Sequence, residues 1–314
     1  MSHRSIDYLR ISVTDRCNLR CTYCMPEGGI EPILHQEILT FEEIARLVRI
    51  FVSLGIKKIR LTGGEPLVRK DVIDLIRTLA GIGGIEEVNL TTNGILLSDH
   101  ADELKKAGVK RLNISLDTLR EERFMSITGH NLFHKVMDGI EKAKRAGFSP
   151  LKLNVVVMKG INDDEVLDFV NFSLSKGLII RFIEFMKITP LWREEYFTPI
   201  EEVKSICERN FVMKRAGYHG PGPAEYYKID GGILGFIKTD KKNCRCCNRL
   251  RLTAAGELKV CLYETGSISL KESLRGGMAD EEIRDIIATS MDIKEFVRHK
   301  DWNSQTAYMS TIGG

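Results

Sequence analysis

Long apolar runs are absent from this sequence. No segment approaches the roughly 18 uninterrupted apolar residues that a membrane-spanning helix requires, and the opening residues MSHRSID contain no apolar stretch that could serve as a secretory signal. We therefore expect a cytoplasmic chain with no membrane association. Its 314 residues, 43% of them hydrophobic and 28% charged, are sufficient for a large core.

Net charge is also small. A formal charge of +3 is too low to indicate nucleic-acid binding. An anionic partner must therefore be recognised by a local cluster of basic groups.

The length suggests two domains of about 150 residues each, although a single barrel of this size is common.

Eight cysteines are present, and most of them are grouped. Three lie within residues 17–24 and four within residues 244–261, while Cys207 stands alone in an amphipathic run. In a reducing compartment such groups indicate metal ligands or structural thiols rather than disulfides. We interpret Cys207 as a small buried side chain.

The first group, Cys17, Cys21 and Cys24, has the spacing C-x3-C-x2-C. This differs from the paired C-x2-C knuckles of a structural zinc site and from a four-cysteine ferredoxin. Three thiolates leave one coordination position open, which predicts a reactive iron–sulfur cluster. With Tyr23 before the last cysteine, the loop resembles that of the radical S-adenosylmethionine (SAM) enzymes, in which SAM fills the vacant position on a 4Fe-4S cluster.

Strand-like and helical runs alternate six times between residues 8 and 186. The expected strands are Leu9–Val13, Lys58–Thr62, Val88–Thr92, Arg111–Leu116, Lys152–Val157 and Ile179–Phe185. The expected helices are Thr40–Leu54, with Thr40 and Glu43 spaced as a capping box, Asp71–Ala80, Ser98–Ala107, Phe133–Ala146 and Asp163–Ser175. Repeated βα units predict a parallel sheet, and six units predict a partial barrel that is open on one side.

Polar and apolar residues alternate within these strands, as in Leu9, Arg10 and Ile11. Because helices must cover the apolar face, the polar face should point into the barrel and form a lumen with room for ligands. Three cations share that face: Arg10, Arg60 and Lys152. Buried like charges require an anion between them, such as a polyphosphate or carboxylate. The alternative is that each cation pairs with a nearby acid: Asp15, Glu65 or Asp117.

The βα rhythm stops after residue 186. A turn and hairpin are expected around residues 230–232, and a helix over Ile200–Arg209. We place a domain boundary near residue 200, with a barrel over residues 1–200 and a C-terminal α+β domain over residues 201–314.

The second cysteine group lies in this C-terminal part and consists of Cys244, Cys246, Cys247 and Cys261. By number these residues could form a four-cysteine zinc site, although adjacent cysteines have little freedom to bind one metal together. The alternative is a second set of three cysteine ligands with the spacing C-x2-C-x13-C, formed by Cys244, Cys247 and Cys261. Arg249 and Arg251 alternate beside this group on an expected strand and could bind phosphate bidentately.

A glycine motif, Thr62-Gly-Gly-Glu-Pro66, directly follows the second strand, where a barrel carries its ligand-binding loops. Paired glycines allow a ligand to approach the backbone closely. Together with the cysteine loop, the motif resembles the radical SAM segment that binds the amino group of SAM.

Combined with Gly222-Pro-Ala-Glu-Tyr226 and the terminal Gly313-Gly314, these motifs resemble the GTP 3′,8-cyclases of molybdenum cofactor biosynthesis across the whole chain. The resemblance implies a partial (β/α)6 TIM-type barrel with a C-terminal extension, two 4Fe-4S clusters, and GTP between them. It assigns the clusters to Cys17, Cys21 and Cys24, and to Cys244, Cys247 and Cys261. It assigns SAM contacts to Tyr23, Gly64, Ser115 and Met186. It assigns GTP contacts to Arg10, Arg60, Thr91, Lys152, Arg249 and Arg251. It suggests catalytic roles for Arg181, Gly313 and Gly314, and leaves Cys246 without one.

The resemblance also implies a mechanism and partners. An electron from the first cluster cleaves SAM to methionine and a 5′-deoxyadenosyl radical, which takes the 3′ hydrogen of GTP. The resulting radical closes onto C8 of guanine to give 3′,8-cyclo-7,8-dihydro-GTP, with guanine held by the second cluster. The expected partners are an electron donor such as flavodoxin or ferredoxin and a downstream cyclic pyranopterin monophosphate synthase, and a homodimer is left open.

Two other classes share part of this pattern. A peptide-modifying radical SAM maturase has the first cysteine motif, but typically carries more C-terminal cysteines and a peptide-binding extension. A zinc-ribbon binding protein would use the cysteines at 244–261 without catalysis.

Overall fold

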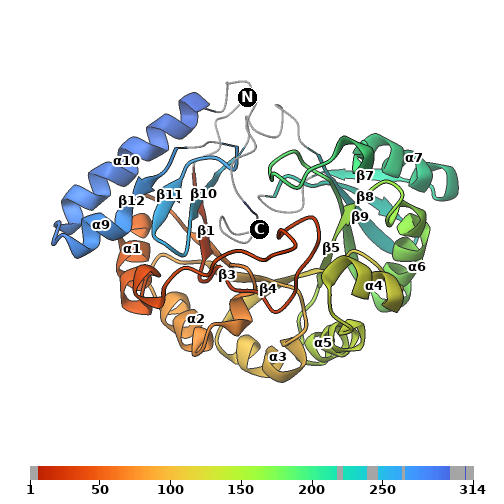
Figure 1. Cartoon of the computed structure of the whole chain (residues 1–314), viewed down its shortest axis with the longest axis horizontal. Helices are drawn as coiled ribbons and strands as arrows, with labels where there is room; N and C mark the ends of the chain where they lie inside the picture. Colours follow the sequence, from red (N-terminus) through yellow and green to blue (C-terminus); the bar gives the residue numbers. More distant parts are fainter. Residues whose placement is uncertain (1–5, 218–221, 239–246, 264–265, 298–307, 309–314) are drawn as a thin grey trace.

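The parallel strands expected from the sequence form the centre of one curved sheet. The computed structural model describes residues 6–217, 222–238, 247–263, 266–297 and 308. Six neighbouring parallel strands match the prediction: β1 (Tyr8–Ser12), β2 (Lys58–Thr62), β3 (Glu87–Thr92), β4 (Val109–Ser115), β5 (Lys152–Val157) and β6 (Ile179–Glu184). Figure 1 shows helices along the outside of this curved sheet, which confirms the predicted partial barrel.

The outer helices follow the predicted βα order. They are α1 (Phe41–Ser53), α2 (Val72–Ala80), α3 (Leu97–Lys106), α4 (Glu121–Thr128), α5 (Phe133–Arg145) and α6 (Val166–Lys176), with short 3-10 turns at His35–Glu37, Pro66–Val68, Asp163–Glu165 and Glu194–Tyr196. The capping box is confirmed, because the Thr40 hydroxyl accepts from the Glu43 amide at 3.2 Å and the Glu43 carboxylate accepts from the Thr40 amide at 2.7 Å. The sequence analysis missed α4, whose single turn of apolar residues is too short for a clear helical period.

The chain beyond residue 186 extends both edges of the same sheet. On one edge, after α7 (Ile200–Asn210), lie β7 (Lys214–Gly217), β8 (Glu225–Ile229) and β9 (Gly232–Ile237), with β9 parallel to β6. On the other lie β10 (Arg249–Leu252), parallel to β1, then β11 (Glu257–Lys259) and β12 (Ile268–Ser269), followed by α9 (Leu270–Arg275) and α10 (Asp280–Val297).

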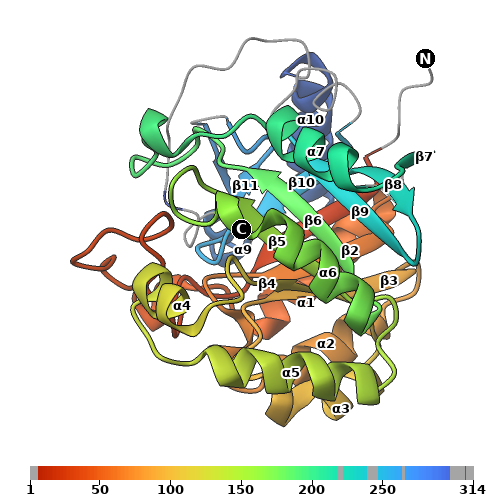
Figure 2. The ribbon, with the colours of Figure 1, turned by 90° about the vertical axis from the view of Figure 1, so that its right-hand side faces the viewer.

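The predicted hairpin at residues 230–232 is therefore the β8–β9 turn. The C-terminal strands do not form a sheet of their own among the described residues, and Figure 2 shows β8 and β9 continuing beside β6. The domain boundary at residue 200 stays a prediction, because strand pairing does not test whether either part folds alone.

The two faces of the central strands differ as expected. Alternate residues such as Leu9, Ile11 and Ile59 are fully buried in the core beneath the helices. The opposite face carries Arg60, Asn113 and other buried polar side chains. A polar lumen thus lies inside the curved sheet. No helix within the described ranges is long and apolar enough to cross a membrane.

Candidate active site

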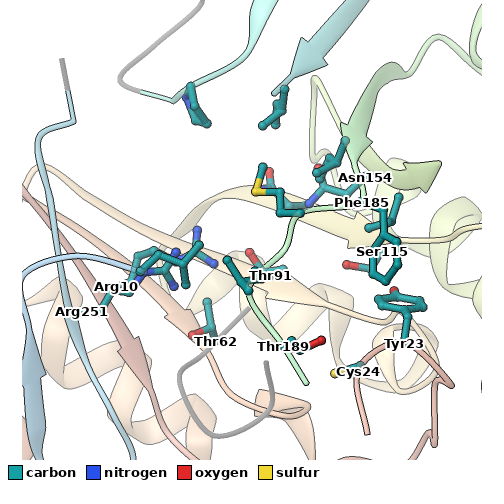
Figure 3. Close-up of a pocket in the computed structure, with 18 of the residues that line it drawn as sticks. Arg10, Tyr23, Cys24, Thr62, Thr91, Ser115, Asn154, Phe185, Thr189 and Arg251 are labelled. Carbon is teal, nitrogen blue, oxygen red and sulfur yellow. The ribbon is translucent and has the colours of Figure 1, made fainter. Parts of the chain in front are cut away.

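A cavity of about 380 Å³ lies at the carboxyl ends of the parallel strands. Its walls come from the loops after β1 to β6 and from the segment between β10 and Tyr263. Figure 3 shows Arg10 and Arg251 together on one side, and Tyr23, Cys24 and Ser115 on the other. The first cysteine group, the glycine motif, and Cys247 and Cys261 of the second group therefore contribute to one space.

Cys17, Cys21 and Cys24 all line this cavity. Their loop is fixed against the end of α4, because Arg20 and Thr22 donate their backbone N–H groups to the carbonyls of Thr128 and Ile127, each at 2.9 Å. Burial raises the pKa of Cys21 well above its usual value, and nearby Cys24, Asp117 and Cys17 raise it further. Three thiolates are thus unfavourable here unless a positive centre binds them.

The arrangement fits a cluster better than a single metal ion. No group of three or more histidine, cysteine or acidic side chains within the described ranges converges on one ion. A 4Fe-4S cluster has a different requirement, because each thiolate binds a different iron and the sulfur atoms stand apart around it. The chemistry of three thiols on one cavity wall therefore suits such a cluster.

The glycine motif runs directly against this cysteine loop. Gly64 donates its N–H to the Thr14 carbonyl, and Glu65 donates to the Arg16 carbonyl, each at 2.8 Å. A Cβ on Gly64 would lie 2.3 Å from the Arg16 oxygen, and one on Gly63 would lie 2.6 Å from the Thr14 oxygen. The glycines are therefore required by the approach of the chain's own backbone, an aspect that the sequence analysis did not predict.

Gly64→Ala is expected to displace the cysteine loop, because the added Cβ would meet the Arg16 backbone, which cannot rotate away as a side chain can. We expect a thermal midpoint lowered by several degrees and loss of SAM binding, measured by calorimetry and equilibrium dialysis. Gly83→Ala is the matched control, since nothing lies within 4 Å of its added Cβ. Equal behaviour of the two variants would contradict this role of Gly64.

The nearby acids do not neutralise the lumen cations. Glu65 is fully buried and accepts hydrogen bonds from the Leu67 amide at 3.1 Å, the Thr92 hydroxyl at 2.8 Å and the Asn93 amide at 2.6 Å. Asp117 accepts from the Tyr23 hydroxyl at 2.6 Å and the Val156 amide at 2.8 Å, and Asp15 accepts from the Ile33 amide at 2.7 Å. The acids thus hold loops in place.

The raised pKa of the buried Glu65 carboxyl leads us to expect that the stability of the protein depends on pH. Burial raises its pKa from 4.5 to about 7, although the three donors oppose this shift. Because the folded pKa exceeds the unfolded one, stabilisation by the bound proton is complete below about pH 4.5 and is lost as the pH rises through about 7. As the pH rises over this range, the unfolding free energy of the natural protein should fall by up to about 3 kcal/mol relative to that of Glu65→Gln. Urea denaturation of both proteins at several pH values tests this, and a constant difference would refute it.

Four arginines line the cavity: Arg10, Arg181, Arg249 and Arg251. Burial, together with the charge of Arg249, lowers the pKa of Arg251 to about 10. Burial likewise lowers the pKa of Arg10 well below its usual value, with Arg251 adding to the effect. Mutual repulsion of this kind is relieved when an anion binds among the cations.

The remaining predicted cations, Arg60 and Lys152, are buried behind the cavity wall. Arg60 donates to the Tyr8 hydroxyl at 2.5 Å, the Leu90 carbonyl at 3.1 Å and the Thr91 hydroxyl at 3.3 Å. Lys152 donates to the Tyr226 hydroxyl at 3.1 Å. These partners are neutral groups, so they do not cancel the charge of either cation beside the lumen.

Of the second cysteine group, Cys247 and Cys261 line the cavity wall next to Arg249. The pKa of Cys247 is lowered to about 6; its burial alone would raise this value, but Arg249 and Lys294 outweigh that effect. A thiol that ionises this readily is a good metal ligand. Cys244 and Cys246 lie outside the described residues, as do Gly313 and Gly314.

The other predicted contacts also meet at the cavity. Gly64, Thr91, Ser115 and Met186 line it, and the Tyr263 hydroxyl lies 3.5 Å from the Met186 sulfur. The sequence analysis missed Lys294, which is only 2% exposed and donates to the Val260 carbonyl at 2.6 Å. Its position in the buried stripe of α10 with Ile283, Ile287 and Ser290 was the available signal.

Comparison with known proteins agrees with this site. The family description "Radical SAM superfamily" matches residues 11–173, and "Molybdenum Cofactor Synthesis C" matches residues 178–300. GTP 3′,8-cyclase of Thermodesulfovibrio yellowstonii is 47% identical, with 99% of this chain and 98% of that protein covered. The enzyme of the same name from Syntrophomonas wolfei is 45% identical with the same coverage. The chain belongs to the GTP 3′,8-cyclase family.

GTP 3′,8-cyclases are radical SAM enzymes, so this chain uses SAM and a 4Fe-4S cluster. A solved structure of SuiB from Streptococcus suis bound to SAM has a similar fold, with a TM-score of 0.61, 14% identity, and coverage of 89% of this chain and 68% of that one. At that identity the likeness concerns the fold alone.

Proposed function

We propose that this GTP 3′,8-cyclase converts GTP to 3′,8-cyclo-7,8-dihydro-GTP in the cavity inside its partial barrel, as the first step of molybdenum cofactor biosynthesis. The observation that carries the proposal is that one cavity is lined by Cys17, Cys21 and Cys24, by Cys247 and Cys261, and by four arginines. This arrangement brings a radical source and an anion site into the same enclosed space.

At one end, Cys17, Cys21 and Cys24 would hold the 4Fe-4S cluster, and Tyr23, Gly64, Ser115 and Met186 would contact SAM. When bound, the cluster and SAM together supply the radical that removes the 3′ hydrogen of GTP. The protein contributes orientation and exclusion of water. The tyrosine of the cysteine loop is fixed for this task, since its hydroxyl donates to Asp117 at 2.6 Å.

At the other end, we assign a second 4Fe-4S cluster to Cys247, Cys261 and Cys244, with an open position for the guanine base. The low pKa of Cys247, about 6, supports metal binding at this wall. Arg10, Arg249, Arg251 and Thr91 would contact the triphosphate, with Arg60 and Lys152 supplying charge from behind. Arg181, which lines the cavity between β5 and β9, would orient the reacting ribose or its phosphates.

The terminal Gly313 and Gly314 are expected to take part in cyclisation. Deleting both should abolish formation of the cyclic nucleotide while both clusters and SAM binding remain. Iron content, SAM dialysis and product chromatography measure these separately. Full cyclisation by the truncated enzyme would contradict this role.

The remaining partners follow from the reaction. A flavodoxin or ferredoxin would deliver the electron, and a cyclic pyranopterin monophosphate synthase would consume the product. GTP, SAM and the absence of disulfide bonds among the cysteines that the structure describes suit a reducing cytoplasm. A homodimer is compatible with these roles.

The reaction is tested with anaerobically reconstituted, reduced protein incubated with SAM and GTP. We expect 5′-deoxyadenosine and a cyclised nucleotide to form together. Deoxyadenosine formation at the same rate without GTP would contradict the substrate, and zinc without iron at the second site would contradict the second cluster.

A further inference from the structure

Tyr226 is a buried tyrosine that the family resemblance leaves without a role. It is only 2% exposed and belongs to β8, which is two strands from β6. The registers of the sheet place Arg181 of β6 opposite Gly235 of β9, and Gly235 opposite Tyr226. These three residues therefore form one row across the sheet, on the same face as the lumen cations.

Gly235 leaves the space that Tyr226 occupies. A Cβ at this position would lie 2.9 Å from the Tyr226 ring and 3.0 Å from Cγ of Arg181. Contacts this short do not occur between real side chains, so any other residue would push the two groups apart. The tyrosine therefore reaches across the intervening strand and packs directly against Arg181.

The ring and hydroxyl of Tyr226 both contact cations that the GTP assignment uses. Its hydroxyl accepts from the Lys152 ammonium at 3.1 Å, and that ammonium lies 5.0 Å from the ring centroid. The second cation is Arg181, whose Cγ lies 3.0 Å from the position of a Cβ on Gly235, while the Tyr226 ring lies 2.9 Å from that same position. A phenol orients cations without cancelling their charge, as a carboxylate would, so the charge stays available to an anion.

A similar contact exists on the opposite side of the lumen. There the Tyr8 hydroxyl, also buried, accepts from Nε of Arg60 at 2.5 Å. Buried cations beside the cavity are thus held on both sides by tyrosine hydroxyls.

We propose that Tyr226 is a positioning residue that holds Lys152 and Arg181 for the triphosphate of the substrate. The proposal deepens, and rests on, the assignment of GTP as substrate. It predicts that Tyr226 contributes to recognition of the phosphates and not of the guanine or ribose.

Tyr227 provides a matched control within the same strand. It also accepts a hydrogen bond from a lysine, Lys204 at 2.7 Å, and its ring lies 4.3 Å from that ammonium. This pair involves α7 and lies on the opposite face of β8, away from the cavity. Tyr227→Phe thus removes an equivalent interaction without touching the site.

The test measures dissociation constants of GTP and of guanosine by equilibrium dialysis with the reconstituted, unreduced enzyme. Tyr226→Phe should weaken GTP binding roughly tenfold to a hundredfold, the range of hydrogen bonds to charged groups. Guanosine binding should stay unchanged, and Tyr227→Phe should bind both ligands as the natural enzyme does. The KM for GTP should rise more than kcat falls.

Equal GTP affinity in Tyr226→Phe and Tyr227→Phe would overturn the proposal, and so would equal weakening of GTP and guanosine. Should Tyr226→Phe fail to fold, Gly235→Ala decides by the same comparison, because its Cβ would crowd both the Tyr226 ring and Cγ of Arg181; an undiminished preference for GTP would be the contradicting result. A wrong substrate assignment would give a different result from a wrong role for Tyr226. In that case the natural enzyme itself would bind GTP no better than guanosine.

Discussion

Cys21→Ala should abolish reductive cleavage of SAM. Cys21 sits between the other two cysteines of its loop and lines the cavity, and the charges of both neighbours act on it. With one of three thiolates missing, a 4Fe-4S cluster loses a ligand that no other side chain replaces, since Asp117 already accepts two hydrogen bonds. We expect 5′-deoxyadenosine formation to fall below detection and about half of the bound iron to be lost.

Cys207→Ala is the control for this experiment. Cys207 is fully buried on α7 and belongs to neither group, as the sequence predicted. Its loss should lower stability by about 1 kcal/mol, a modest core truncation, without changing iron content or SAM cleavage. If Cys21→Ala kept the iron and activity of Cys207→Ala, the first cluster would have to be bound elsewhere.

Cys261→Ala should separate radical formation from cyclisation. Cys261 lines the same cavity as Cys247 and the first cysteine group, and Lys294 donates a hydrogen bond to the carbonyl of the preceding residue, Val260. Removing it should release the second cluster while leaving the SAM site intact. We therefore expect SAM cleavage to continue at a reduced rate, with the cyclic nucleotide reduced at least a hundredfold, a loss of about 3 kcal/mol or more in transition-state stabilisation.

Three measurements distinguish this result from simple unfolding. Iron and zinc analysis should show one cluster remaining and no zinc, calorimetry a folded protein, and chromatography deoxyadenosine without cyclised product. A variant that still made the cyclic nucleotide at the natural rate would show that the second cysteine group is not needed for the reaction.

Much of the fold could be predicted from local pattern. The alternation of Leu9, Arg10 and Ile11 identified a strand with one buried and one lumen face, and the Thr40–Glu43 capping box marked the start of α1. These features depend on neighbouring residues and on backbone periodicity, so they are visible without the fold. The helix α4 was missed because the apolar residues among its eight residues span only about one turn, which gives too little periodicity.

The partners of the buried polar groups were not predictable in this way. Glu65 could have paired with a lumen cation, yet it fixes the loop after β3. Lys294 comes from the last helix to the second cysteine group, and Tyr226 reaches Lys152 over 74 residues of sequence. Such contacts depend on strand order and register, which no short segment specifies.

The sequence by itself determined the chemistry available to this protein: two cysteine groups, a glycine motif, and cations on the polar face of parallel strands. Only the tertiary structure decided that these meet in one cavity, because β9 and β10 attach at opposite edges of the barrel sheet. It also decided which groups contact the buried cations. Sheet register brings tyrosine hydroxyls, and not carboxylates, against Arg60 and Lys152. Desolvation strengthens the field of these charges, which supports the proposed anion site.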